Sequence, residues 1–187
     1  MRKIKVGVIG IGHLGSIHAK IYRENENCTL SAICDIDKNR LNELSSSLNV
    51  PGYSDYQELF DKAEAVSIAT PTKLHYKIAQ DFLKHKIHCL VEKPFTIQLK
   101  EADKLIKLAD RQKIILAVGH VERFNSAFSA TQKLIKNPKF IECHRLSPFP
   151  NRSLDIGVVL DIMIHDIDIV LGLVPARLKK IESVGVN

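Results

Sequence analysis

A glycine-rich loop near the N-terminus has the residue types and spacing of a dinucleotide-binding turn. It reads Gly10-Ile11-Gly12-His13-Leu14-Gly15, follows a β-branched apolar run, and opens a segment with helical spacing. Asp35 ends the next apolar run, 20 positions after Gly15 (35 − 15 = 20). In this pattern the first glycine makes the turn, the second leaves room for a pyrophosphate, and the third lets helix and strand pack closely. A glycine turn needed only for packing is the alternative, and the surrounding pattern favours binding.

Asp35, the acid that ends the second apolar run, indicates which dinucleotide would bind. Free N–H groups and the positive dipole end of a helix attract the phosphates. The carboxylate of Asp35 can hold the two ribose hydroxyls and would repel a 2′-phosphate, which favours NAD over NADP. Lys38 and Arg40 lie close in the sequence and could soften that preference.

A lysine stands where ligands of open α/β sheets bind. The tripeptide Glu92-Lys93-Pro94 follows the apolar run 87–91, and parallel sheets bind ligands at the carboxyl ends of their strands. Lys93 can therefore reach the nicotinamide ribose and a substrate hydroxyl. An ordinary exposed lysine, one of 27 basic residues, is the alternative. The predicted cofactor-binding residues are Gly10, Gly12, His13, Leu14, Gly15, Asp35, Thr70, Pro71, His75, Glu92 and Lys93; Thr70, Pro71 and His75 could instead cap the following helix.

An aspartate and a histidine interrupt an apolar stretch near the C-terminus. Asp161 and His165 are four residues apart and share a predicted helix face, with Asp168 one turn further on. Polar groups in such a helix are costly unless they are satisfied or functional. An imidazole that titrates near neutrality can remove a proton from an alcohol. A histidine buried against Asp161 for packing and a metal site are the alternatives; no second histidine follows at i+4, so we assign no metal.

The elements that must position these residues alternate along residues 1–120. Apolar runs predict strands at 3–9, 29–34, 63–69, 87–91 and 114–118, and helical spacing predicts helices at 14–24, 37–48, 75–84 and 99–109. This alternation predicts βαβ units in an α/β fold, with the doubly wound parallel sheet of a Rossmann domain.

From residue 121 the regular alternation of strands and helices ends. Helices are predicted at 121–135 and 156–173, and strands at 139–146 and 176–186. Two strands are too few to bury a sheet face. We therefore expect an incomplete second domain over 121–187, in a fragment or truncated product of something longer.

The length, charge and composition of the chain limit the classes of molecule that it is expected to bind. With 187 residues there is room for one domain and part of a second. The net charge of +6 allows nucleic acid or a small anion as a partner, but the basic residues are scattered, tryptophan is absent and aromatic residues make up 6%, which disfavours nucleic acid. We expect no membrane span, because no uncharged apolar stretch of about 18 residues exists. Four cysteines without C-x-x-C spacing favour a reduced, cytoplasmic protein.

Together these motifs resemble those of the glucose-fructose oxidoreductase / inositol dehydrogenase family of NAD(P)-dependent sugar dehydrogenases. The resemblance rests on Gly10–Gly15, Asp35, residues 69–72 with His75, residues 92–94, residues 123–125, and Asp161 with His165. It implies a Rossmann domain followed by an α+β substrate domain with a mostly antiparallel sheet, often in homodimers or tetramers. It also implies that Lys93 contacts the nicotinamide ribose and the reacting hydroxyl, that the Lys93–Pro94 peptide can be cis, that His165 is the general base, and that Asp161 orients sugar and base.

Residues 119–125, 145–149 and 161–169 resemble one subgroup, which oxidises the 3-hydroxyl of UDP-N-acetylglucosamine ahead of amination in lipid A precursor synthesis. Arg123, Arg145 and Arg152 would then suit a diphosphate, because arginine forks match phosphate oxygens; ordinary surface arginines are the alternative. The candidate substrate residues are Arg123, Asn125 and Arg152. Met163 departs from the glycine of many members, and relatives continue past residue 187.

The predicted function is hydride transfer between a sugar or sugar-nucleotide hydroxyl and NAD. A truncated or inactive chain that binds NAD without turnover is the alternative. A nucleic-acid binder rests on the charge of +6 alone.

Overall fold

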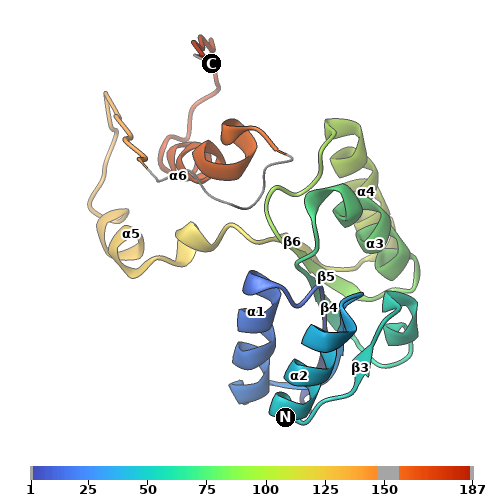
Figure 1. The fold of residues 1–187 in the computed structure, drawn as a ribbon. Coiled ribbons are helices and arrows are strands. Elements are labelled where there is room, and N and C mark those ends of the chain that lie inside the picture. The colour runs from blue at the N-terminus through green and yellow to red at the C-terminus, as the bar shows by residue number, and fades with distance from the viewer. Residues whose placement is uncertain (1, 147–155, 186–187) are drawn as a thin grey trace. The chain divides into compact units, whose positions relative to one another are not determined.

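A computed structural model describes residues 2–146 and 156–185 (Figure 1). The chain forms two compact units that divide between Gly119 and His120. Among the described helices, none has the length and apolar character needed to cross a membrane.

The first unit is built on six strands that all pair in parallel, in the order β3-β2-β1-β4-β5-β6. The strands are β1 Ile4–Ile9, β2 Cys28–Cys34, β3 Gly52–Tyr53, β4 Ala65–Ile68, β5 His88–Val91 and β6 Leu116–Val118. The order reverses between β1 and β4, which is the switch point where doubly wound sheets bind ligands. The predicted Rossmann sheet is confirmed; the two-residue strand β3 was not predicted.

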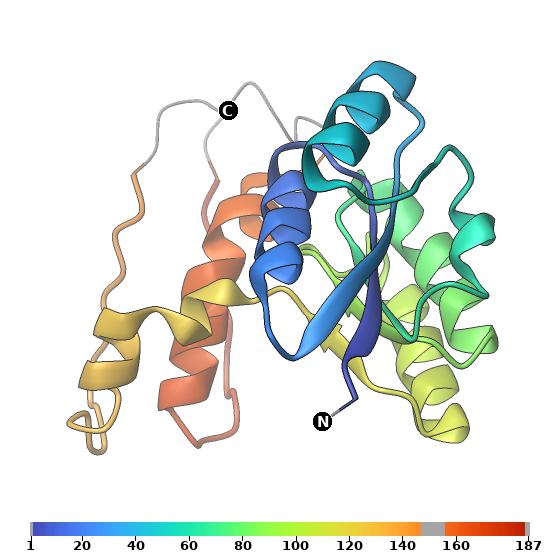
Figure 2. The ribbon, with the colours of Figure 1, turned by 90° about the horizontal axis from the view of Figure 1, so that it is seen from below.

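Four long helices cover the two faces of this sheet (Figure 1, Figure 2). They are α1 His13–Glu24, α2 Lys38–Leu48, α3 Thr72–Lys84 and α4 Leu99–Gln112; the short 3-10 helix η1 spans Tyr56–Leu59. One core joins α1 and α2 to the sheet through Ala19, Leu41 and Ile33. The other joins α3 and α4 to the opposite face through Phe82 and Leu105, both fully buried. Burial on both faces explains why the central strands read as continuous apolar runs.

The second unit contains only helical elements in its described residues. These are the 3-10 helix η2 Val121–Phe124, α5 Ser126–Thr131, the π-helical turn η3 Val159–Met163 and α6 Ile164–Leu173. The helix predicted over 121–135 is interrupted at Asn125, whose side chain caps α5 by accepting from the N–H of Ala127. The helix predicted over 156–173 begins as a π turn and continues as α6.

The two strands predicted in this unit, at 139–146 and 176–186, are wrong for the described residues 139–146 and 176–185, which form no strand. A strand needs a neighbour for its backbone N–H and C=O groups, and no described segment of the unit pairs with either stretch. Their apolar side chains, such as Phe140 and Ile181, are exposed accordingly. The antiparallel sheet implied by the family resemblance is therefore not present in these described residues.

Candidate functional site

The glycine loop between β1 and α1 has the shape that a bound pyrophosphate requires. Gly10 lies at φ +79°, and a Cβ there would stand 2.8 Å from the carbonyl oxygen of Ala69. A Cβ at Gly15 would stand 1.8 Å from the carbonyl oxygen of Gly10, so helix and loop pack without room for a side chain. Gly12, by contrast, has no atom within 4 Å of an added Cβ. No side chain caps the N-terminus of α1, so open space and backbone N–H groups meet where the phosphates would lie.

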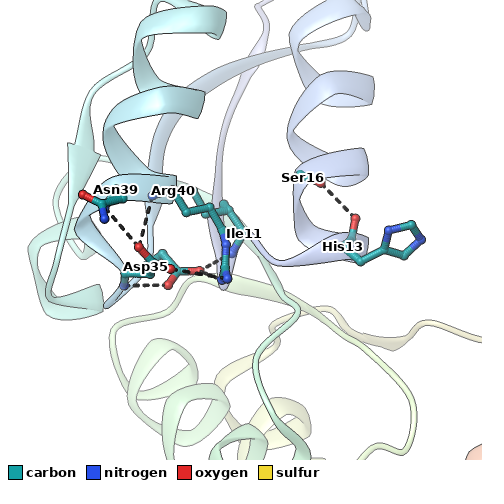
Figure 3. A network of polar contacts seen from close by, with 7 residues as sticks. Ile11, His13, Ser16, Asp35, Asn39 and Arg40 are labelled. Atoms are coloured by element: carbon teal, nitrogen blue, oxygen red, sulfur yellow. Dashed lines mark hydrogen bonds and ion pairs between the residues drawn. The ribbon is translucent and has the colours of Figure 1, made fainter. Parts of the chain in front are cut away.

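Asp35 stands directly after β2, and its carboxylate faces this loop (Figure 3). Its side chain is buried and accepts the N–H of Ile11 at 2.8 Å and the N–H of Asp37 at 2.9 Å. The half-exposed guanidinium of Arg40 approaches the same carboxylate at 3.5 Å. The next residue, Ile36, was not predicted as a site residue; it is 88% exposed and offers apolar surface beside Asp35.

An open pocket of about 370 Å³ lies beside Arg40, between α1 and α2. Its lining residues are Ile11, Gly12, His13, Ser16, Lys20, Arg40, Glu43, Leu44 and Ser47. The ring of His13 points away from Asp35 (Figure 3), and the predicted loop residue Leu14 is partly exposed. Lys20 and Arg40 make this pocket suited to an anionic group.

The turn after β4 brings the next predicted residues to the same edge of the sheet. Pro71 is the N-cap of α3, which begins at Thr72. The Oγ1 atom of Thr70 is buried and has no hydrogen-bond partner among the described residues. His75, one turn into α3, is 1% exposed, and its ring nitrogens lie 2.9 Å from the carbonyl oxygen of Pro94 and 2.8 Å from that of Thr70.

Glu92 and Lys93 follow β5 at this edge, and the Lys93–Pro94 peptide is cis, as the family resemblance allowed. The Glu92 carboxylate is buried and accepts the backbone N–H of Lys93 at 3.2 Å. A Cβ at Gly119, which follows the neighbouring strand β6, would stand 2.7 Å from the same carboxylate. Gly119 therefore leaves the space that Glu92 occupies. Lys93 also takes part in at least one further interaction in the structure.

His18 and Ser67, which the sequence did not single out, form a polar network with Glu92. The Nε2 atom of His18, on α1, lies 3.3 Å from the carboxylate, and its Nδ1 atom lies 2.6 Å from the hydroxyl of the fully buried Ser67. Burial raises the pKa of Glu92, but the hydrogen bond and charge of His18, together with the N–H and charge of Lys93, outweigh it. The pKa of Glu92 therefore lies below its ordinary value of 4.5.

This lowered pKa predicts a loss of stability in acid. A carboxyl group whose pKa is lower in the folded than in the unfolded chain stabilises the fold above its ordinary pKa, here 4.5, and the contribution disappears as pH falls through the folded value. We expect the stability advantage of the wild type over Glu92→Gln, measured by urea unfolding, to shrink between pH 5 and pH 3. An advantage that stays constant over this range would contradict the network.

In the second unit the candidate general base and its partner stand on two different helical elements. His165 is the second residue of α6, and Asp161 lies in the π turn that precedes it. The boundary between the π turn and α6 thus falls between the two residues, and the shared helix face that the sequence predicts stays a prediction. Both side chains take part in polar or electrostatic interactions in the structure.

The candidate substrate residues of this unit have partners of their own. The guanidinium of Arg123 binds Asp168 through two bonds of 2.7 and 2.6 Å, which lowers the pKa of Asp168. Asn125 caps α5 and donates weakly to Glu122 at 3.3 Å. Arg145 forms a second fork, with Asp166, a pairing that the sequence did not predict. Arg152, with residues 147–149 of the subgroup motif, lies outside the described residues.

Comparison with known proteins places this geometry in a family. Residues 4–120 match a family described as an oxidoreductase family with an NAD-binding Rossmann fold. Over 187 residues the chain is 38% identical to the UDP-N-acetylglucosamine 3-dehydrogenase of Acidithiobacillus ferrooxidans, covering 100% of this chain and 59% of that protein. It is 30% identical over 177 residues to the myo-inositol 2-dehydrogenase of Thermotoga maritima, covering 88% of this chain and 53% of that protein.

Solved structures agree with these matches. The structure of the Acidithiobacillus ferrooxidans enzyme superposes with a TM-score of 0.86, covering 92% of this chain and 57% of that one. A probable dehydrogenase from Thermotoga maritima, 28% identical, gives a TM-score of 0.82 over 91% of this chain and 55% of the other. The chain thus spans just over half the length of these relatives. With its glycine loop, Asp35 and the Glu-Lys-Pro turn at one sheet edge, the chain belongs to the glucose-fructose oxidoreductase / inositol dehydrogenase family of NAD-binding oxidoreductases.

Proposed function

We propose that the protein is an NAD-dependent oxidoreductase that oxidises a hydroxyl group of a sugar or sugar nucleotide. One observation carries the proposal: the open space at Gly12, the buried acid Asp35 and the lysine Lys93 all lie at the carboxyl edge of one parallel sheet. This is where doubly wound sheets bind dinucleotides.

The residues present fit NAD. The loop around Gly12 would receive the pyrophosphate, Asp35 the adenosine ribose, and the exposed side chain of Ile36 the adenine ring. The Oγ1 atom of Thr70, which has no hydrogen-bond partner among the described residues, is a buried polar atom at the same edge. When bound, NAD supplies the acceptor for a hydride.

The remaining chemistry falls to side chains of the protein. We propose that His165 removes the proton of the reacting hydroxyl, that Lys93 donates a hydrogen bond to the same oxygen and to the nicotinamide ribose, and that Asp161 orients sugar and base. Proton removal by a positioned imidazole contributes on the order of 10²–10⁴ to the rate. Holding the hydroxyl in the right orientation beside the hydride acceptor contributes the larger share of the rate enhancement.

The substrate proposal is the 3-hydroxyl of UDP-N-acetylglucosamine. Its support is the 38% identity to a UDP-N-acetylglucosamine 3-dehydrogenase over the whole chain. Arg123 suits a diphosphate, because Asp168 fixes its guanidinium through two of its five donors and leaves the others available. Asn125 and Arg152 complete the proposed substrate residues.

Two further properties follow from the same proposal. We propose that the partners are small molecules rather than nucleic acid, with the second unit serving substrate binding and assembly into a homodimer or tetramer. A cytoplasmic location and a place in lipid A precursor synthesis stay predictions.

Binding and turnover measured on one sample test the proposal. Fluorescence titration with NADH should show saturable binding, and addition of UDP-N-acetylglucosamine to the protein with NAD⁺ should raise the absorbance at 340 nm. Binding without turnover on a panel of sugars and sugar nucleotides would favour the alternative, a protein that holds NAD and catalyses nothing. The exposed apolar side chains of the second unit, Phe140 and Ile181 among them, favour keeping that alternative in the test. Absence of binding would overturn both.

Arg40 is predicted to set how strictly NAD is preferred. Its guanidinium partly neutralises Asp35 at 3.5 Å and borders the open pocket where a 2′-phosphate would lie. We expect Arg40→Ala to weaken NADPH binding by about tenfold, the value of one hydrogen bond to a charged group, and to leave NADH binding within about twofold. Arg111→Ala, which removes an exposed arginine in the last turn of α4, is the control. Equal changes for both nucleotides would contradict this role.

A further inference from the structure

The buried ring of His75 joins two loops at the cofactor edge. Its Nδ1 atom lies 2.9 Å from the carbonyl oxygen of Pro94, and its Nε2 atom lies 2.8 Å from the carbonyl oxygen of Thr70. Carbonyl oxygens only accept hydrogen bonds, so a ring nitrogen that carries a proton can donate to the oxygen beside it. The ring lies within hydrogen-bond distance of both loops at once.

The two carbonyl groups belong to segments that carry candidate cofactor contacts. Thr70 ends the loop after β4, and its Oγ1 atom is buried without a hydrogen-bond partner among the described residues. Pro94 directly follows Lys93 in the turn after β5. The two segments are 24 positions apart (94 − 70 = 24), yet both bind the same side chain.

His75 itself is placed to act indirectly. The residue is 1% exposed, and both of its nitrogens are used by backbone oxygens of the protein. Neither nitrogen is then available to donate to a nucleotide. The sequence pattern predicted His75 as a cofactor-binding residue, and the contacts explain how it could serve the cofactor through the loops that it holds.

We propose that His75 is a positioning residue with two separable arms: the Nε2 arm fixes the Thr70 loop for NAD binding, and the Nδ1 arm fixes the Lys93–Pro94 turn for catalysis. The kinetic half of this proposal rests on the proposed dehydrogenase function. The structural half concerns only the two loops and stands by itself.

Three substitutions separate the arms. In His75→Asn the side-chain amide lies near the position of Nδ1 and keeps a donor for Pro94, whereas in His75→Gln it lies near Nε2 and keeps a donor for Thr70. His75→Phe keeps the ring volume and removes both donors. Phe82→Leu, a core change on the same helix seven residues from His75 that keeps both ring donors, is the control for lost stability.

Hydrogen exchange of the full protein without nucleotide is the first readout. We expect His75→Asn to speed exchange in peptides covering 69–74, His75→Gln in peptides covering 92–98, and His75→Phe in both. Phe82→Leu should leave the contrast between the two segments unchanged. Equal exchange in the Asn and Gln variants, or the same pattern in Phe82→Leu, would overturn the two-arm arrangement whether or not the protein is a dehydrogenase.

Steady-state kinetics supply the second readout. We expect His75→Asn to raise KM for NAD by about tenfold with kcat within about twofold, and His75→Gln to lower kcat by on the order of tenfold with little change in KM, since small misplacements of catalytic groups are costly. A purely structural role would lower kcat and raise KM together, in proportion to the loss of Tm, as we expect for Phe82→Leu, and would overturn the proposal. Lack of turnover in the wild type would instead count against the proposed function, with the exchange pattern still deciding the role of His75.

Discussion

Gly12→Val is expected to leave the fold intact and to weaken NADH binding by more than about a hundredfold, which corresponds to roughly 2.8 kcal/mol. The fold should survive because an added Cβ at Gly12 meets no atom within 4 Å. Binding should fail because the new side chain fills the space that the pyrophosphate needs beside the N-terminus of α1. Thermal unfolding and fluorescence titration of the same sample measure the two effects separately.

Two glycines give matched controls for this experiment. Gly172→Ala, at a position on α6 that also has open space around it, should leave binding unchanged and should not lower stability. Gly15→Ala should lower both, because its Cβ would stand 1.8 Å from the carbonyl oxygen of Gly10. If Gly12→Val bound NADH as tightly as the wild type, the phosphates would not lie at this loop.

His165→Ala is expected to lower kcat by on the order of 10²–10⁴, the usual contribution of a positioned general base. Binding of NADH should stay within about twofold, since the residues proposed to hold the nucleotide belong to the first unit. The rise of kcat with pH that a general base produces should disappear with the side chain. Pre-steady-state and steady-state rates over pH 5–9 measure this loss.

A second histidine of the same unit provides the control. His144 is exposed and pairs with Glu142 at the surface, so His144→Ala should leave kcat unchanged. If His165→Ala retained full turnover with an unaltered pH profile, His165 would not be the base, and the reaction would need another proton acceptor.

The cofactor half of the site could be predicted from the sequence because its signals are local. The turn from Gly10 to Gly15 and the acid Asp35 are fixed by their spacing within one βαβ unit. Long strands and helices were found through their periodicity, whereas the two-residue strand β3 is too short to leave a pattern.

The network behind Glu92 could not be predicted, because it is assembled from distant parts of the chain. His18 and Ser67 are 49 positions apart. The same holds for the ion pair of the second unit, where Arg123 and Asp168 are 45 positions apart. A polar residue on the inner side of α1 and a serine within an apolar strand were the available signals, and neither identifies its partner. Such pairs are known only when the topology is known.

The second unit was predicted less well because strand formation depends on a neighbour. Residues 139–146 have strand-like composition, yet their backbone finds no partner strand in the described part of the unit. β-propensity reflects packing on a sheet more than a preference of the isolated segment. The helix predicted over 121–135 was wrong for a local reason: the side chain of Asn125 accepts the N–H of Ala127, and this capping bond starts a new helix at Ser126.

A crystal structure of the full protein with NAD⁺ is the measurement that tests the central claim most directly. The account predicts pyrophosphate against the open face of Gly12, ribose hydroxyls on Asp35, and the nicotinamide ring within about 5 Å of both the Lys93 amine and the His165 imidazole, close enough for reaction once substrate binds. A nucleotide held elsewhere, or Lys93 and His165 directed into separate regions around a correctly bound NAD⁺, would contradict it.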